Sequence, residues 1–411
     1  MPTMSLAAKA QMYQASVEAE HQSEDGVIRY RYEKGQTGSG NLPDGSFFMG
    51  IYTATQALRY TVTQSPEARA QLLLSLDAME LYAKVTGRRG LLPRYVSREK
   101  PDDERWQQST TCPEFFWRRD VSKDQYAGYV HGLGVTFAVV QDPEIRRRIA
   151  SLAAALADHL IEHDLIITDV NDKPTRFSVL RAKEYGFPAG VNALISLAIA
   201  KTAAVSNPEP RYEEFYERLV RERYVKVAGS AHWEPLGIAL RVNDNMSYLA
   251  LYPLLLLETD PELLLQLRQG GRRTWVGVGE DRNAFFSFVH AAVVGDARWQ
   301  LEPGQEPGDV ARERGRVSLR EFPEDKASWS VDLTREGFDF PRAFLNSKNC
   351  EPRSTQAIPV YLRYRGSNMW VSDPYQLVGR LGAKGERRNS GCDYLIAYWI
   401  GRYHGFVAAN E

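Results

Sequence analysis

The sequence predicts an all-α fold in which helical hairpins close into an (α/α)6 toroid, as a single domain over residues 1–411. Two observations support this prediction. A similar helix-start triplet recurs four times along the chain, and each copy separates a nearly all-apolar segment from an amphipathic one. A buried helix, a short turn and a half-exposed helix form a hairpin whose apolar face needs neighbouring hairpins to cover it. Repeated hairpins of this kind therefore favour a closed ring.

The recurring triplet combines a capping residue, a proline and a glutamate. Ser, Asp or Asn side chains accept hydrogen bonds from the free amides of a first helical turn, and proline at the first helical position loses no useful hydrogen bond. The glutamate complements the positive end of the helix dipole. The four triplets, each of which predicts a helix start, begin at Ser65, Asp142, Asn207 and Asp260.

The order of the segments predicts about twelve helices in six pairs. Small and apolar residues fill the segments predicted as buried helices, whereas the segments after the triplets keep one polar face. The buried helices are expected at 46–63, 122–140, 190–205, 245–258, 283–294 and 393–407. Outer helices are expected at 5–20, 144–162, 212–226 and 309–319, among others. The alternative is an open solenoid, whose repeats should have similar lengths and polar ends, unlike the segments here.

Helical periodicity fails between residues 318 and 388. Residues 329–333 and 360–364 alternate between apolar and polar side chains, and many prolines and glycines lie between them. This pattern predicts a long loop that carries short strands. We expect this loop to lie over the mouth of the toroid.

Composition argues against several classes of function. Lys plus Arg number 51 and Asp plus Glu 52, so no net charge attracts nucleic acid or an anionic membrane surface. Cys112, Cys350 and Cys392 lack CxxC spacing and indicate neither a disulfide framework nor a zinc site. We expect no cofactor and no metal. The N-terminal segment lacks the continuous apolar stretch of a signal peptide, which favours a cytoplasmic protein, or an exported one whose signal is absent from this sequence.

In a closed ring of hairpins the buried helices all point the same way, so their N-terminal ends gather at one rim. Six such ends supply free backbone amides, which favour polar or anionic ligands. The segments leading into these ends also carry clustered charged and aromatic residues. The candidate catalytic carboxylates are Asp120, Asp124, Asp44 and Glu280. The candidate substrate-binding residues are Trp117, Arg118, Arg119, Lys123, Tyr126, His131, Asn245, Asn283, Asp393 and Tyr394.

These residue types suit the chemistry of sugars. Aromatic rings offer flat faces to sugar rings, Arg and Asn bind hydroxyl or carboxylate groups, and paired carboxylates divide the roles of general acid and base. We expect Asp120 and Asp124 to be the acid and base, and a pair drawn from across the mouth, with Asp44 or Glu280, is an equal alternative. A structural explanation also exists for part of the pattern, because Ser122 and the glutamine three residues later match a capping box.

Other chemistries lack a motif in this sequence. No GxGxxG segment follows a predicted strand, and no Walker loop, HExxH pair or Gly-x-Ser-x-Gly elbow is present. His159 and His163 lie four residues apart on a predicted outer helix, beside Asp158 and Glu162. That setting favours a solvated helix face over a metal site.

Three segments carry a resemblance to a known superfamily. They are 117–129, which reads WRRDVSKDQYAGY, 85–94, which ends GLLPR, and 390–405, which reads SGCDYLIAYWIGRYHG. On these segments the chain resembles the six-hairpin glycosidase-like superfamily of (α/α) toroids, in particular bacterial members of uncertain activity. The resemblance implies a carbohydrate-active pocket at the rim, with a small molecule or an oligosaccharide as substrate. Enzymes of this superfamily include inverting glycoside hydrolases, polysaccharide lyases and sugar epimerases.

Two alternatives to a glycoside hydrolase remain open from the sequence. A lyase or epimerase would use a Tyr or His base with an Arg or Asn clamp on a uronic carboxylate. A toroid without catalysis would instead bind a glycan or a partner protein. The residues that a lyase or epimerase would use are Tyr126, His131, Arg119, Asn245 and Tyr394.

Overall fold

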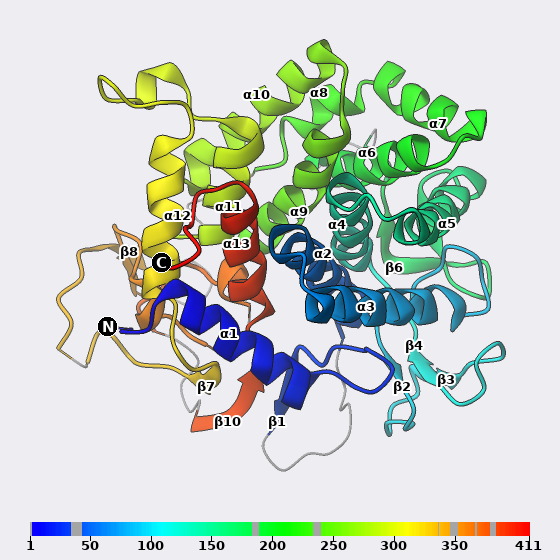
Figure 1. Cartoon of the computed structure of the whole chain (residues 1–411), viewed down its shortest axis with the longest axis horizontal. Coiled ribbons are helices and arrows are strands. Elements are labelled where there is room, and N and C mark those ends of the chain that lie inside the picture. Colours follow the sequence, from blue (N-terminus) through cyan, green and yellow to red (C-terminus); the bar gives the residue numbers. More distant parts are fainter. Residues whose placement is uncertain are drawn as a thin grey trace.

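The predicted (α/α)6 toroid is confirmed. The computed structural model describes residues 2–33, 43–182, 189–232, 240–335, 337–345, 352–365, 368–378 and 384–411. Within them, each inner helix contacts the next around a ring, and the last contacts the first (Figure 1). The inner helices are α2 (Gly45–Thr63), α4 (Lys123–Val139), α6 (Ala189–Ser206), α9 (Arg241–Leu257), α11 (Ala284–Val289) and α13 (Cys392–Tyr403).

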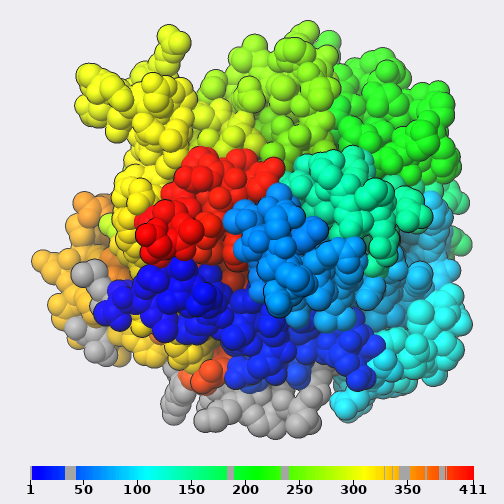
Figure 2. All heavy atoms as spheres, in the orientation of Figure 1, coloured from blue at the N-terminus to red at the C-terminus, as the bar shows by residue number. Residues whose placement is uncertain are grey.

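Outer helices cover this ring and complete the hairpins. Helix α1 packs on α13, so the two ends of the chain form the sixth pair, and the Ala7 amide donates to the Glu411 carbonyl at 3.1 Å. Figure 2 shows these ends, blue and red, side by side on one face. The outer helices are α1 (Leu6–Ser16), α3 (Pro66–Lys84), α5 (Pro143–Glu162), α7 (Pro210–Arg221) with α8 (Tyr224–Ala228), α10 (Pro261–Val278) and α12 (Asp309–Glu321).

Three of the predicted helix starts have the expected caps. The side chains of Ser65, Asp142 and Asp260 accept hydrogen bonds from first-turn amides of α3, α5 and α10. The fourth prediction is wrong, because the Asn207 side chain donates to the carbonyls of Ala150 and Ala203 and so completes the preceding helix. Helix α7 consequently begins at Pro210 rather than at the proline of the triplet.

Two further helix predictions need correction. Helix α9 begins at Arg241, four residues before the predicted start, so the polar residues 243–245 lie inside its first turns. The predicted outer helix 212–226 is divided into α7 and α8, because Arg223 adopts the left-handed conformation with φ of 66°. Short π-helical turns, Val17–His21 and His290–Val294, continue α1 and α11 to the predicted ends.

Short antiparallel sheets precede several inner helices. The four sheets have the strand orders β1-β10-β7, β2-β4-β3, β5-β6 and β8-β9. Four residues (119–122) separate β4 from α4, and two residues (390–391) separate β10 from α13. The strands are β1 (Arg31–Glu33), β2 (Val96–Ser97), β3 (Trp106–Gln108), β4 (Phe116–Arg118), β5 (Ile166–Thr168), β6 (Pro174–Val179), β7 (Ala327–Trp329), β8 (Arg342–Leu345), β9 (Pro352–Ser354) and β10 (Lys384–Asn389).

The segment predicted as a loop with short strands does contain short strands. One of the two predicted strands, at residues 360–364, is wrong. Residues Val360–Leu362 form a 3₁₀ turn, because Pro359 starts a tight turn whose carbonyl accepts from the Leu362 amide at 3.0 Å. Around residues 329–333, the strand ends at Trp329, and Asp332 forms an isolated bridge with Val378.

The inner helices pack very closely in two places. A Cβ atom on Gly50 of α2 would lie 1.9 Å from the Gly128 carbonyl oxygen of α4, so only glycine allows this approach. Across the ring, a Cβ atom on Gly134 would lie 2.6 Å from Pro253 of α9. Contact between α4 and α9 closes the middle of the ring at this level. Polar chemistry therefore belongs at the helix ends.

Helix α6 is the one described helix that is long and apolar enough to cross a membrane. Its apolar window is 78% buried inside the fold, where it packs against α4, α5, α7 and α9. The apolar composition of α6 is explained by its burial in the inner ring.

Candidate active site at the start of helices α2 and α4

Two carboxylates from different helix starts meet at one side-chain amide. Nε2 of Gln125, in the first turn of α4, donates to Asp44 at 3.2 Å and to Asp124 at 3.0 Å. Asp44 immediately precedes α2, and its side chain is 34% exposed. Asp124 is half-buried, and Gln125 is fully buried. Both carboxylates are thus fixed in place and still accessible.

The sequence at the start of α4 sets the orientation of that amide. The Ser122 backbone amide donates to Oε1 of Gln125 at 3.0 Å, which is one half of the predicted capping box. Since Oε1 faces the cap, Nε2 faces the carboxylates. The Ser122 hydroxyl also donates to Asp124. The capping pattern in this sequence therefore has a second effect, which is to hold two acidic groups together.

Arg94 joins the segments around the pair. Its guanidinium lies 3.6 Å from the Asp44 carboxylate and donates to the Ser122 hydroxyl at 2.7 Å and to the carbonyls of Pro43 and Asp120. Sequence reasoning missed this residue. The signal that could have found it is its place at the end of segment 85–94, which carries part of the family resemblance.

Burial and charge set the protonation behaviour of the site. Burial, followed by the negative charge of Asp124, raises the pKa of Asp44 to about 6, against the opposing effects of Arg94, Arg31 and Arg118. Such a carboxyl group can hold a proton close to neutral pH and release it during a reaction. Burial lowers the pKa of Lys123 to about 8, with Asp124 acting in the opposite direction.

Lys123 extends the site towards the next inner helix. Its Nζ donates to Oδ1 of Asn192 on α6 at 2.7 Å, and Nδ2 of Asn192 donates to the Arg181 carbonyl. Lys123 is half-buried, so a polar ligand over the α4 start can reach it. The starts of α2, α4 and α6 are thereby joined by side-chain contacts, as the predicted common rim requires.

The other residues of the 117–124 segment have separate environments. Asp120 has a left-handed backbone with φ of 60°, and its carboxylate accepts from the Arg176 amide of β6 at 3.1 Å rather than from Gln125. Arg119 pairs with Asp169 at 2.7 Å. Trp117 is fully buried within β4. The structure therefore pairs Asp124 with Asp44, and not with Asp120.

Three predicted binding residues are core residues instead. Tyr126, His131 and Tyr394 are fully buried, and each has a polar atom bonded to a main-chain carbonyl. The Tyr126 hydroxyl donates to Gly90 at 2.9 Å, His131 Nδ1 lies 2.9 Å from the Leu249 oxygen, and the Tyr394 hydroxyl donates to Leu6 at 2.8 Å. Their polar atoms tie helices together, which is why these polar rings occur in apolar helices. The lyase or epimerase set is therefore not assembled.

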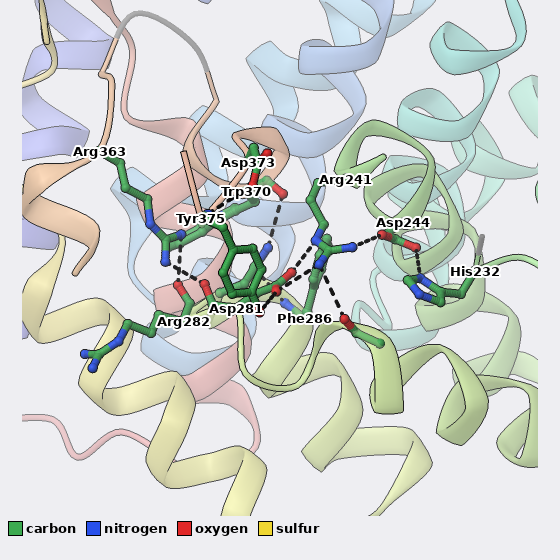
Figure 3. Close-up of polar contacts among 12 residues, drawn as sticks. His232, Arg241, Asp244, Asp281, Arg282, Phe286, Arg363, Trp370, Asp373 and Tyr375 are labelled. Atoms are coloured by element: carbon green, nitrogen blue, oxygen red, sulfur yellow. Dashed lines mark hydrogen bonds and ion pairs between the residues drawn. The ribbon is translucent and has the colours of Figure 1, made fainter. Parts of the chain in front are cut away.

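A second polar cluster lies at the starts of α9 and α11 (Figure 3). Arg241, fully buried, pairs with Asp244 at 3.1 Å and with Asp281. Asp244 lies 2.8 Å from Nδ1 of His232, and the Tyr375 hydroxyl donates to Asp281 at 3.1 Å. Burial raises the pKa of Asp281 to about 6, while Arg241, Arg363 and Tyr375 act against it. The cluster fixes the 375 region to the rim.

The remaining candidates from these helices serve in structural contacts. Asn283 caps α11 through the Phe286 amide and donates to the Trp370 carbonyl at 3.1 Å. Asp393 pairs with Lys326 at 2.9 Å and accepts from the Met369 amide. Asn245 is buried on α9, and its Oδ1 has no partner among the described residues. These contacts place Met369 and Trp370 against the starts of α11 and α13.

Glu280 is directed away from the carboxylate pair. Its side chain is 74% exposed and pairs with Arg314 on the outer helix α12. It lines an outer depression of about 400 Å³ that Asp309 and Glu313 of the same helix also border. The structure therefore does not bring Glu280 to Asp44 and Asp124.

The outer histidine pair also differs from expectation. His159 is buried, because strand β5 covers it and the Thr168 amide donates to its Nε2 at 3.2 Å. Over the described ranges, no three His, Cys, Asp or Glu side chains are placed to hold a metal ion. Residues 41–42 and 184–188, which lead into the inner helices expected at 46–63 and 190–205, lie outside the described residues, as does Cys350.

Comparison with known proteins gives only distant similarities. No protein-family model and no curated protein matches the chain. Among solved structures, the GH76 alpha-1,6-mannanase from Salegentibacter sp. HEL1_6 has a TM-score of 0.48 at 9% identity, with 98% of this chain and 100% of that chain covered. The cellulase Cel9M of C. cellulolyticum has a TM-score of 0.46 at 11% identity, with 99% and 100% covered. The toroid assignment rests on the helix contacts of this chain itself.

Proposed function

We propose that this protein is a glycoside hydrolase in which Asp44 and Asp124 are the catalytic carboxylates. The observation that carries the proposal is the convergence of both groups on Nε2 of Gln125, at the N-terminal ends of two inner helices. Two carboxyl groups placed close together, one of them able to hold a proton, are the equipment that glycosidic bond cleavage requires. Of the pairs that the sequence left open, this is the one drawn from across the mouth, with Asp44 rather than Asp120 beside Asp124.

The two carboxylates have different environments and hence different roles. Asp44, whose pKa is raised to about 6, donates a proton to the leaving oxygen of the glycosidic bond. Asp124 accepts hydrogen bonds from Ser122 and Gln125, which orient it, and it supplies the nucleophile at the anomeric carbon. After the leaving group departs, the ionised Asp44 takes a proton from the water that releases the sugar.

The separation of the pair supports a mechanism with retention. Two hydrogen bonds of about 3 Å to one nitrogen place the nearest carboxylate oxygens at most about 6 Å apart. Retaining enzymes hold their carboxyl groups about 5–5.5 Å apart, whereas inverting enzymes need about 6.5–9.5 Å to admit a water molecule. The shared amide favours the narrower spacing. Retention is thus part of the proposal.

The test is the release of reducing ends from a panel of oligosaccharides of different composition and linkage. We expect the wild-type protein to cleave at least one of them, and Asp44→Asn and Asp124→Asn each to lower kcat by about 10²–10⁴-fold, the range for general acid–base groups. Asp120→Asn is the matched control, because asparagine tolerates the left-handed backbone and keeps an oxygen acceptor for the Arg176 amide.

Three results would decide against the proposal. Full activity in both the Asp44→Asn and Asp124→Asn variants would exclude the pair as catalytic groups. An unsaturated product that absorbs in the ultraviolet would indicate a lyase. Binding of a glycan by calorimetry, without cleavage at any pH, would support the alternative of a toroid that only binds.

A further inference from the structure

Arg118, whose charge acts on Asp44 of the proposed catalytic pair, is a buried cation with two guanidinium nitrogens that lack a hydrogen-bond partner among the described residues. Arg118 is only 5% exposed, and its Nε and Nη1 atoms have no hydrogen-bond partner within the described parts of the chain. Burying a guanidinium without partners is costly, so proteins pair such groups almost without exception. An unpartnered buried Arg at the edge of an active site indicates that a ligand supplies the partner.

The neighbouring arginines have partners, which distinguishes Arg118 from them. Arg94 lies against Asp44 and Ser122. Arg105 forms hydrogen bonds with both carboxylate oxygens of Asp103, at 2.9 and 3.1 Å from Nε. Burial, then the positive charges of Arg105 and Arg94, lower the pKa of Arg118, with Asp103 and Asp44 acting in the opposite direction. Of these three arginines, Arg118 is therefore the one without a carboxylate partner among the described residues.

Arg118 is also coupled to the site through its position in the chain. It ends strand β4, and its carbonyl accepts from the Arg94 amide at 2.8 Å. Its charge acts on Asp44 and on Tyr30. The Tyr30 hydroxyl, also buried, is a second donor for which the described residues offer no partner. Arg118 and Tyr30 thus each have an unused donor, and the charge of Asp44 acts on both.

We propose that Arg118 binds the carboxylate of a uronic acid residue in the substrate, so that the enzyme acts on acidic glycans. This inference rests on the proposed function, because it assigns a substrate class to the same site. The planar guanidinium matches a carboxylate through two parallel hydrogen bonds, which a lysine cannot reproduce. The Tyr30 hydroxyl donates to the same uronic residue. A neutral sugar would leave the Arg118 charge unbalanced.

The test compares each acidic oligosaccharide with a copy in which its carboxyl groups are reduced to primary alcohols. The probes are oligosaccharides of galacturonate, of glucuronate and of mannuronate, with linkages unchanged by the reduction. We expect the wild-type protein to have a kcat/KM at least ten-fold higher on one acidic probe than on its reduced copy. Arg118→Gln should raise KM for the acidic probe at least ten-fold more than KM for the reduced copy, and Arg118→Lys should restore only part of the preference.

Arg98→Gln is the control variant, since Arg98 is an exposed arginine next to strand β2 that pairs with Asp25. It should keep the preference for the acidic probe. The comparison of wild-type substrates does not depend on whether a variant folds, so the inference stays testable if Arg118→Gln is unstable.

The outcomes separate this inference from the proposed function. Equal cleavage of acidic and reduced probes would overturn the role of Arg118 and leave the hydrolase intact. Binding of an acidic probe that requires Arg118, without cleavage, would support the role of Arg118 and overturn the hydrolase. If the protein neither binds nor cleaves any acidic probe, the inference is overturned.

Discussion

Asp44 and Asp124 lie at the starts of two different helices and accept hydrogen bonds from the same Gln125 amide, at 3.2 and 3.0 Å. The two carboxylates come together because α2 and α4 pack closely. At Gly50 and Gly128 the two helix backbones are in direct contact, with no side chain between them. A feature of the core thus determines the geometry of the site.

The pH dependence of activity should follow Asp44. Because only the protonated carboxyl group can donate to the leaving oxygen, kcat/KM should fall as the pH rises through about 6, the value to which the Asp44 pKa is raised. The measurement is a pH–rate profile of the wild-type protein on its best oligosaccharide. A profile that stays flat from pH 5 to about pH 8 would contradict the assignment of Asp44 as the acid.

The same group should make the protein less stable as the pH rises. The folded state raises the pKa of Asp44 from an ordinary value of about 4, so it binds the proton more tightly than the unfolded state does. The resulting stabilisation is complete below about pH 4 and is lost between about pH 4 and 6. Asp44→Asn removes this ionisation, so we expect its Tm at pH 7 to equal or exceed that of the wild type while activity is lost. A large fall in Tm would show that Asp44 is a structural residue.

Gly50→Ala should disturb both stability and activity. An added Cβ atom would lie 1.9 Å from the Gly128 carbonyl oxygen, so α2 and α4 must separate. Overpacking of this kind lowers the free energy of unfolding by about 1–3 kcal/mol. The separation should also lower kcat in the protein that remains folded. Denaturant unfolding and activity assays measure the two effects, and Thr63→Ala, at the exposed end of the same helix, should change neither.

Arg241→Met should be severely destabilising. Arg241 is paired with Asp244 and Asp281, and its loss leaves two buried carboxylates without their cation. Breaking such a pair costs about 3–5 kcal/mol. The comparison is Arg221→Met, which removes an exposed ion pair with Glu217 and should cost at most about 1 kcal/mol. Similar losses in the two variants would show that the buried cluster does not hold the rim together.

The sequence was sufficient for the helical hairpins and only partly sufficient for the site. Caps at Ser65, Asp142 and Asp260 and the apolar inner segments follow local rules, so the ring could be predicted from them. Periodicity also placed Asp44 and Asp124 at helix starts. It could not tell which start meets which, because that depends on how closely two helices approach and on the glycines between them.

The individual errors have the same physical origin. Tyr126 and Tyr394 lie near helix starts in the sequence, but their rotation about the helix axis turns them into the core, where their hydroxyls bond to carbonyls. Glu280 comes just before an inner helix and nevertheless turns outward to Arg314. Arg94 was missed because it lies in no predicted helix start, and its role follows only from tertiary contacts.

Chemical rescue of the nucleophile tests the central claim most directly. Asp124→Ala should be inactive on an activated aryl glycoside of the sugar that the wild type releases, because the carboxylate that attacks the anomeric carbon is gone. Azide, which fits the vacated space as a small anionic nucleophile, should restore cleavage and give a glycosyl azide of configuration opposite to the substrate. Asp120→Ala should need no rescue. Full activity of Asp124→Ala without azide would contradict the claim that the pair joined by Gln125 performs the reaction.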